Sequence, residues 1–253
     1  MQKGRMELKL DGQVALVTGA GGLIGAAVAR ALAQAGARTA LTYFSNRAAV
    51  ENLAAELREI GSKVVLVRAD VTVEREVNEA VLRVEQEWGR VDILVNVVGH
   101  YLRKPLAETT AAEWQDLLQS NLTSAFLACK AALPGMRRRS HGRIINVGLA
   151  GLESGRGFVH IGAHAVAKSA LLAFTRSLAK QEAPYGISVN LVSPGFVEDP
   201  TMSAAERQEL ANRIPAGRLA SPEEVANAVL FLASSAAAYI TGTNLEVAGG
   251  WGL

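Results

Sequence analysis

A glycine-rich turn near the start of the chain has the composition and position of a phosphate-binding loop. It reads Thr18-Gly19-Ala20-Gly21-Gly22-Leu23-Ile24-Gly25 and joins the apolar run 14–17 to a helix-forming segment, 26–32. Glycines let the backbone turn sharply and approach a pyrophosphate, whose charge is stabilised by the N-terminus of the next helix. Tight turns also use glycine for steric reasons alone, but a position between strand and helix favours nucleotide binding. The expected contacts come from Gly19, Gly21, Gly22, Ile24 and Gly25.

The end of the second apolar run bears on the choice between NAD and NADP. Sites for NAD usually carry Asp or Glu about 20 residues after the glycines, where it binds the ribose hydroxyls. Segment 42–47 contains no acid and ends in Ser45, Asn46 and Arg47. These side chains suit a 2′-phosphate, so NADP(H) is favoured over NAD(H). The alternative is that they only cap the helix that follows.

Short apolar runs alternate with helical patterns along the whole chain. The runs cover 14–17, 39–43, 64–67, 93–95, 144–147 and 187–191, and most are continuously apolar, as strands buried on both faces are. Helical spacing between Val50 and Ile60 ends at Gly61, and Ser221-Pro222-Glu223-Glu224 is typical of a helix start. The alternation predicts an α/β fold: a single domain over 1–253 with a Rossmann-type, doubly wound parallel sheet and helices on both faces. Ligands of such sheets bind beyond the carboxyl ends of the strands.

Composition narrows the classes of function. The 253 residues are 49% hydrophobic and 20% charged, which excludes a disordered chain, and a net charge of +2 gives no argument for nucleic acid as a partner. The single cysteine, Cys129, excludes an internal disulfide and a multi-cysteine metal site, and we expect no metal. No apolar run reaches membrane-spanning length and no signal-peptide pattern opens the chain, so we expect no membrane partner and a cytoplasmic location.

Further motifs follow in a fixed order. They are Asp70-Val71, Asp92-Ile93-Leu94-Val95-Asn96 with Gly99, Asn121, Gly142-Arg143-Ile144-Ile145-Asn146, Lys168, Asn190 through Pro194-Gly195, and Tyr239-Ile240-Thr241-Gly242. Together with the glycine loop, their order and spacing make the chain resemble the short-chain dehydrogenase/reductase family from about Leu10 to Gly250. The resemblance implies an NAD(P)-dependent oxidoreductase that acts on a carbonyl or secondary alcohol.

The resemblance also implies residue roles. Asp70 would contact the adenine amino group and Val71 would flank the ring, while Asn96 and Gly99 would line the adenosine ribose. Lys168 would bind the nicotinamide ribose, and Asn121 would hold a water in a proton relay. Asn121 could equally be a helix-kink residue, and the two roles can coexist. The residues expected beside the nicotinamide are Pro194, Gly195 and Val197.

The chain departs from the family where its catalytic residues are expected. The family has a Tyr four residues before the Lys and a Ser at the end of the fifth strand, but this chain has His164 and Gly148-Leu149 there. In the family the Tyr phenol exchanges a proton with the substrate oxygen, and the Lys charge lowers the pKa of that phenol. The chain is thus expected to be a divergent member with an atypical active site of Asn121, His164 and Lys168.

His164 admits two interpretations. Imidazolium can act as a general acid near neutral pH, but the charge of a nearby Lys lowers the His pKa and leaves a neutral imidazole, which suits alcohol oxidation better. Alternatively, His164 fills an abandoned position. Tyr101, Ser154 and His160 are further possible proton donors, although they are more often plain loop residues.

Three functions therefore stay open. The first is an oxidoreductase with His164 as its proton-transferring group. The second is a catalytically silent nucleotide-binding protein, acting as a sensor or partner subunit. The third is a non-redox enzyme on the same scaffold.

The sequence gives less direct information on the oligomeric state and on the substrate. The resemblance implies a homodimer or homotetramer formed by two long helices, about 111–137 and 162–183, unless both helices are simply core. Segment 198–214 is expected to form a lid, and Phe158, Val159 and Phe196 an apolar pocket wall. The identity of the small-molecule carbonyl or alcohol is not indicated.

Overall fold

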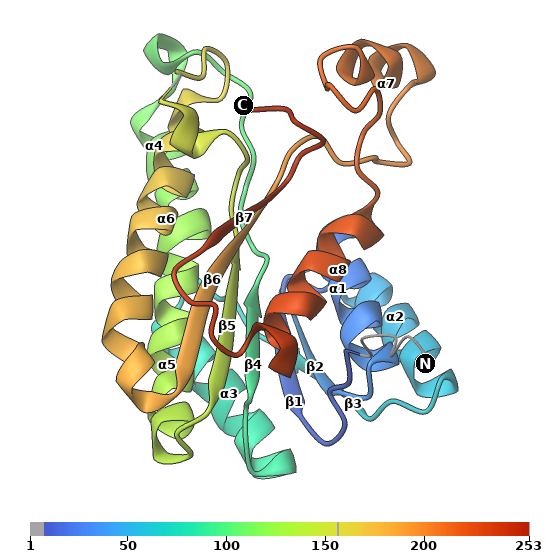
Figure 1. The fold of residues 1–253 in the computed structure, drawn as a ribbon, viewed down its shortest axis with the longest axis vertical. Coiled ribbons are helices and arrows are strands. Elements are labelled where there is room, and N and C mark those ends of the chain that lie inside the picture. Colours follow the sequence, from blue (N-terminus) through green and yellow to red (C-terminus); the bar gives the residue numbers. More distant parts are fainter. Residues whose placement is uncertain (1–7, 156, 253) are drawn as a thin grey trace, which may run out of the picture.

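A parallel sheet forms the centre of the molecule in the computed structural model, which describes residues 8–155 and 157–252 (Figure 1). Its strands are β1 (Val14–Thr18), β2 (Arg38–Tyr43), β3 (Val64–Arg68), β4 (Ile93–Asn96), β5 (Gly142–Val147), β6 (Ile187–Pro194) and β7 (Asn244–Val247). The order across the sheet is β3-β2-β1-β4-β5-β6-β7, with every pairing parallel. All six strands expected from apolar runs are confirmed, and β7 was missed.

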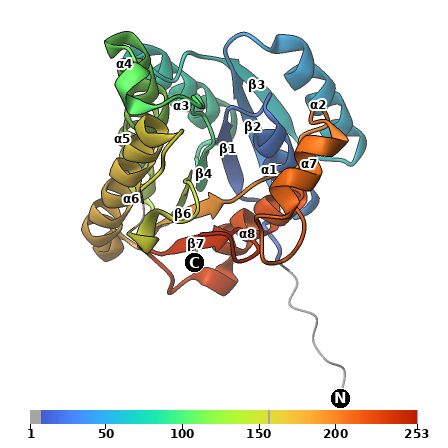
Figure 2. The same ribbon diagram turned by 90° about the horizontal axis from the view of Figure 1, so that it is seen from above.

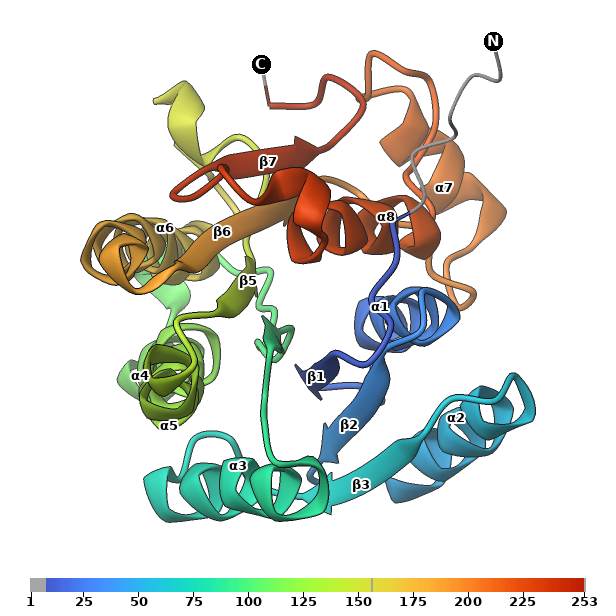
Figure 3. The same cartoon turned by 60° about the horizontal axis from the view of Figure 1, so that its bottom comes forward.

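Helices cover both faces of the sheet (Figure 3). They are α1 (Leu23–Gln34), α2 (Arg47–Glu59), α3 (Glu74–Trp88), α4 (Ala111–Leu118), α5 (Ser124–Arg138), α6 (Gly162–Glu182), α7 (Ala204–Ala211) and α8 (Pro222–Ala233). One apolar cluster packs α1, α2 and α8 on one face, and a second packs α3, α5 and α6 on the other. The predicted single-domain, doubly wound α/β fold is therefore confirmed.

The strand order reverses direction between β1 and β4, because β2 and β3 lie on one side and β5 to β7 on the other. Such a reversal opens space beyond the carboxyl ends of the strands, where ligands of these folds bind. Figure 2 views the molecule from above and shows the helices arranged around the sheet, with α7 on the same side as α1 and α8. The candidate site residues come from the loops at this edge, from the π-helical turn after α4 and from α6.

Local signals place the helix ends as expected. Asn46 and Gly61 flank α2, and Gly61 takes the left-handed conformation (φ +84°) that glycine tolerates. Ser221 caps α8 in a reciprocal capping box with Glu224. The long helix expected over 111–137 is instead α4 and α5 joined by a π-helical turn, Gln119–Thr123, which contains Asn121. A π-bulge of this kind re-aims side chains and often lies at a functional site.

Among the described residues, no helix is long and apolar enough to cross a membrane. The same residues contain no group of three or more His, Cys, Asp or Glu side chains that could hold a metal ion.

Candidate functional site

The glycine loop has the backbone geometry of an anion cradle. Gly19 adopts φ +69°, and a Cβ on Gly25 would lie 2.2 Å from the Gly19 carbonyl oxygen, so both positions require glycine. Gly22 is the N-cap of α1 and supplies no side-chain hydrogen bond, and the first turn has no acidic residue. The first N–H groups of α1 are therefore left for an external acceptor such as a phosphate.

The turn between β2 and α2 borders this loop. A Cβ on Gly21 would lie 3.6 Å from the Cβ of Asn46, which puts the two segments side by side. Asn46 accepts a hydrogen bond from the Ala49 N–H and so caps α2. Capping was the alternative to phosphate binding that the sequence left open. Arg47 Nε donates to Glu51 Oε1 over 2.7 Å along the helix surface, and Ser45 is exposed beside it. Contacts of Ser45, Asn46 and Arg47 with a 2′-phosphate remain a prediction.

The residues expected around the adenosine occupy the ends of β3 and β4. Asp70 Oδ1 accepts hydrogen bonds from the backbone and hydroxyl of Thr72, which closes the turn after β3, and Val71 is buried behind it. The Asn96 side chain is buried and donates to Asn146 Oδ1 over 2.9 Å. A contact of Asn96 with a ribose would therefore come from its backbone, whereas Gly99 is exposed at the edge.

Pro194, Gly195 and Val197 lie at the end of β6, just before segment 198–214. Pro194 is buried, and the Gly195 N–H donates to the Val247 carbonyl oxygen over 3.0 Å. Val197 forms a parallel bridge with Ala220, which joins the start of segment 198–214 to the segment before α8. Backbone interactions with Val247 and Ala220 therefore fix the segment that is expected to lie beside the nicotinamide.

Lys168 and Asn121 meet over Gly99. A Cβ at Gly99 would lie 2.2 Å from Asn121 Oδ1 and 3.3 Å from Lys168 Nζ, so glycine is what allows the approach. Lys168 Nζ donates to the Val147 carbonyl oxygen over 2.7 Å, and burial lowers the pKa of Lys168 to about 8. Asn121 Oδ1 is buried and has no hydrogen-bond partner among the residues that the structure describes. A buried acceptor in this condition is suited to a water or ligand group.

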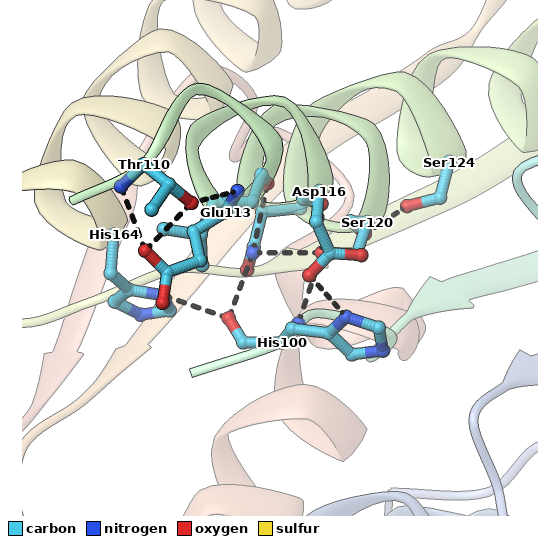
Figure 4. Close-up of polar contacts among 9 residues, drawn as sticks. His100, Thr110, Glu113, Asp116, Ser120, Ser124 and His164 are labelled. Carbon is cyan, nitrogen blue, oxygen red and sulfur yellow. Dashed lines mark hydrogen bonds and ion pairs between the residues drawn. The ribbon is translucent and has the colours of Figure 1, made fainter. Parts of the chain in front are cut away.

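His164 lies one helical turn before Lys168, so both side chains project from the same face of α6. Its ring Nδ1 is 3.1 Å from the backbone carbonyl oxygen of His100, which also accepts from Asn121 Nδ2 over 2.9 Å (Figure 4). Since a carbonyl can only accept, Nδ1 carries the hydrogen and Nε2 is left as an acceptor. Burial first, then the charge of Lys168, lowers the pKa of His164 to about 4.

The segment carrying His100 is held against α4 (Figure 4). The His100 N–H donates to Ser120 Oγ over 3.2 Å, and its ring Nδ1 is 2.7 Å from Asp116 Oδ2. Glu113 and Thr110 form the capping box that begins α4. His100 was not identified from the sequence, because it acts through its backbone and lies 64 residues from His164.

Of the three alternative proton donors considered from the sequence, Tyr101 lies beside His164. The Tyr101 ring is edge-on to the imidazole with centroids 5.3 Å apart. Ser154 Oγ donates to the Gly151 carbonyl oxygen instead, and His160 is exposed.

Phe158 and Phe196 both lie against Trp251 in the C-terminal segment. Phe196 lies 4.9 Å from Trp251 between ring centroids, and Phe158 lies 6.4 Å from Trp251. Val159, expected in the same wall, is 76% exposed. Trp251 was missed because nothing in the sequence brings the C-terminus to the pocket. A groove of about 530 Å³ is lined by residues 198–211, which include α7, and by segment 217–219, and His164 does not line it.

The arrangement as a whole fits a dinucleotide. It combines a glycine cradle that added Cβ atoms would fill, an uncapped helix N-terminus, and a buried Lys and orphaned Asn oxygen at the far end.

Comparison with known proteins identifies the family. Residues 19–252 match the family model described as Enoyl-(Acyl carrier protein) reductase. The 3-oxoacyl-(acyl-carrier-protein) reductase FabG of Vibrio cholerae is 41% identical over 247 residues, covering 96% of this chain and 98% of the relative. FabG of Escherichia coli is 39% identical over the same length and shares of the two chains. The chain belongs to the short-chain dehydrogenase/reductase family.

Solved structures agree with this membership. A putative gluconate dehydrogenase from Agrobacterium tumefaciens superimposes with a TM-score of 0.91 at 34% identity, covering 98% of each chain. A blue fluorescent protein from a metagenomic library, in complex with NADPH, gives 0.88 at 34% identity and covers 97% of this chain and all of that one. As a member of this family, the chain is an NAD(P)-dependent oxidoreductase.

Proposed function

We propose that this family member uses NADP(H) and interconverts a secondary alcohol and a carbonyl, with His164 as the proton-transferring group in place of the family's Tyr. The observation that carries the proposal is the bond from His164 Nδ1–H to the His100 carbonyl oxygen, beside the buried Lys168. It fixes one tautomer and leaves Nε2 as a proton acceptor at the place where the family exchanges its proton.

The cofactor would be held along the edge already described. The glycine loop and the α1 N-terminus would hold the pyrophosphate, and the exposed β2–α2 turn would hold the 2′-phosphate. Asp70 and Val71, with Gly99 and the backbone of Asn96, would hold the adenosine, and Lys168 with segment 194–197 the nicotinamide end. When bound, the nicotinamide supplies a hydride acceptor or donor. The NADPH complex of the metagenomic structure supports the choice of NADP(H).

The protonation state of His164 favours the oxidative direction. With a pKa of about 4, the imidazole is neutral above pH 5, where it accepts a proton far better than it gives one. Nε2 would take the hydroxyl proton of the alcohol, and the Lys168 ammonium, positive below its pKa of about 8, would stabilise the negative charge that develops on the oxygen. Leu149, where the family has Ser, offers no hydroxyl to that oxygen.

The test is turnover with NADP⁺ and secondary alcohols. 3-Hydroxyacyl thioesters are the first substrates to try, because the curated relatives are 3-oxoacyl reductases. We expect NADPH formation by the wild type and its loss in His164→Gln. NADPH binding without turnover of any substrate would contradict catalysis and favour the silent nucleotide-binding protein. In that case His164→Tyr combined with Leu149→Ser should restore some activity.

We further propose a cytoplasmic location, and a homodimer or homotetramer as the family resemblance implies. Leu127, Leu171 and Leu172 belong to the core of the chain, whereas Phe126 and Val166 leave apolar surface on α5 and α6, each 44% exposed. This surface supports pairing through these two helices.

A further inference from the structure

The end of β3 brings a second arginine to the β2–α2 turn. Arg68 is the last residue of β3 and lies in register with Tyr43, the last residue of β2. The Ala69 N–H donates to the Tyr43 carbonyl oxygen over 2.9 Å, so the pairing continues past Arg68. Arg68 is therefore fixed at the same carboxyl edge as the turn that follows Tyr43.

The Arg68 side chain lies over that turn. Its guanidinium carbon is 5.6 Å from the centroid of the Phe44 ring, a distance at which a cation is attracted to an aromatic face. Phe44 is 55% exposed and belongs to none of the apolar clusters. Packing in the core does not explain a large exposed aromatic at this position, whereas orienting the guanidinium does.

Charge separates Arg68 from its neighbour on the turn. The Arg47 guanidinium is paired with Glu51 on the next turn of α2, which offsets its charge and directs it along the helix. Arg68 has no carboxylate partner within the described part of the chain, and it is exposed. Of these two arginines, only Arg68 offers an uncompensated positive charge with donors free for an anion.

The turn itself borders the phosphate cradle, because Asn46 lies beside Gly21. An anion bound here would belong to the same ligand as the pyrophosphate. We propose that Arg68, oriented by Phe44, binds the 2′-phosphate of NADP(H) and determines the preference for NADP(H), in place of Arg47. This inference rests on the proposed use of NADP(H).

The experiment compares matched variants in one binding assay. NADPH and NADH are titrated by nicotinamide fluorescence into the wild type, Arg68→Gln and Arg47→Gln, with melting temperatures recorded to confirm folding. Because a hydrogen bond to a charged group is lost, we expect Arg68→Gln to raise the Kd of NADPH about tenfold to a hundredfold. The Kd of NADH should stay unchanged, and Arg47→Gln should change neither value more than about threefold.

Phe44 is a positioning residue, and its test is the ratio of the two dissociation constants. Phe44→Leu should lower the NADPH preference, while Phe44→Tyr, which keeps an aromatic face, should retain it. A merely structural role would weaken both nucleotides equally.

The outcomes separate the two proposals. A wild type that binds neither nucleotide overturns the proposed function. A wild type that prefers NADPH, and keeps the preference in Arg68→Gln, overturns only the role of Arg68. If Arg47→Gln instead of Arg68→Gln abolishes the preference for NADPH, then Arg47 binds the 2′-phosphate.

Discussion

The cofactor edge and the proposed catalytic end of this molecule differ in how closely we expect them to follow the family. At the cofactor edge, the glycine loop keeps the backbone that a pyrophosphate requires, with Gly19 at positive φ and Gly25 against the Gly19 carbonyl. At the catalytic end, Lys168 and Asn121 meet as the resemblance implies, but His164 and Leu149 occupy the positions expected to hold Tyr and Ser.

The difference has a physical cause. Backbone positions such as Gly25 are set by sterics, and any side chain there displaces the chain itself. A side chain at the start of α6 can change without disturbing the sheet, because His164 fills its space and bonds to the His100 carbonyl. In this chain, sterics therefore constrain the backbone of the glycine loop more tightly than they constrain the side chain that we propose transfers the proton.

The largest effect should come from removing the imidazole. His164→Gln keeps a hydrogen-bonding side chain but no proton acceptor of comparable basicity, so kcat for alcohol oxidation should fall about 10²- to 10⁴-fold. The Kd of NADPH should stay within about twofold, because the described partners of His164, the His100 carbonyl oxygen and the Tyr101 ring, are not assigned to the pyrophosphate or adenosine. Steady-state rates and fluorescence titration measure the two quantities. Equal kcat values would show that His164 transfers no proton.

The glycine loop gives the complementary test. Gly25→Ala places a Cβ 2.2 Å from the Gly19 backbone oxygen, so the loop must shift, at a cost of about 1–3 kcal/mol in unfolding free energy. NADPH affinity should fall with it. Gly22→Ala is the control, since its Cβ meets only the Gly19 oxygen at 3.5 Å and φ is −90°. If both variants melt like the wild type, the steric account of the loop is wrong.

Acid should destabilise the catalytic end through His164. The folded pKa of about 4 lies below the ordinary value of 6.5, so between these values the unfolded chain binds a proton that the folded chain does not. Stability therefore falls as pH drops from 6.5 to 4, by up to about 3 kcal/mol from this group. Denaturant unfolding at pH 7 and pH 4.5 should show a smaller loss in His164→Gln, and identical losses would contradict the shifted pKa.

The smallest effect concerns the β2–α2 turn. Asn46→Ala removes the cap of α2 and should lower the unfolding free energy by about 1 kcal/mol. Thermal unfolding and NADPH titration together separate capping from binding. A change in Kd for NADPH but not for NADH would show that Asn46 also contacts the 2′-phosphate. An unchanged unfolding free energy would show that Asn46 does not stabilise α2 as its cap.

Much of the fold could be predicted because its strands are continuous apolar runs, each followed by a turn or helix signal. β7 was missed because Asn244–Val247 is a short edge strand of mixed polarity. The cofactor loop could be located from local sequence, since its chemistry resides in the backbone. The hydrogen-bonding environment of His164 could not, because the His100 carbonyl oxygen and the π-helical turn that holds Asn121 come beside it only in the folded chain.

The most direct test of the central claim is a titration of NADPH and NADH into the wild type and His164→Gln side by side. If the cofactor site functions independently of His164, both proteins should bind NADPH saturably and with the same Kd. Both should also bind NADPH more tightly than NADH. If neither nucleotide binds the wild type, the cofactor edge does not function and the account is contradicted.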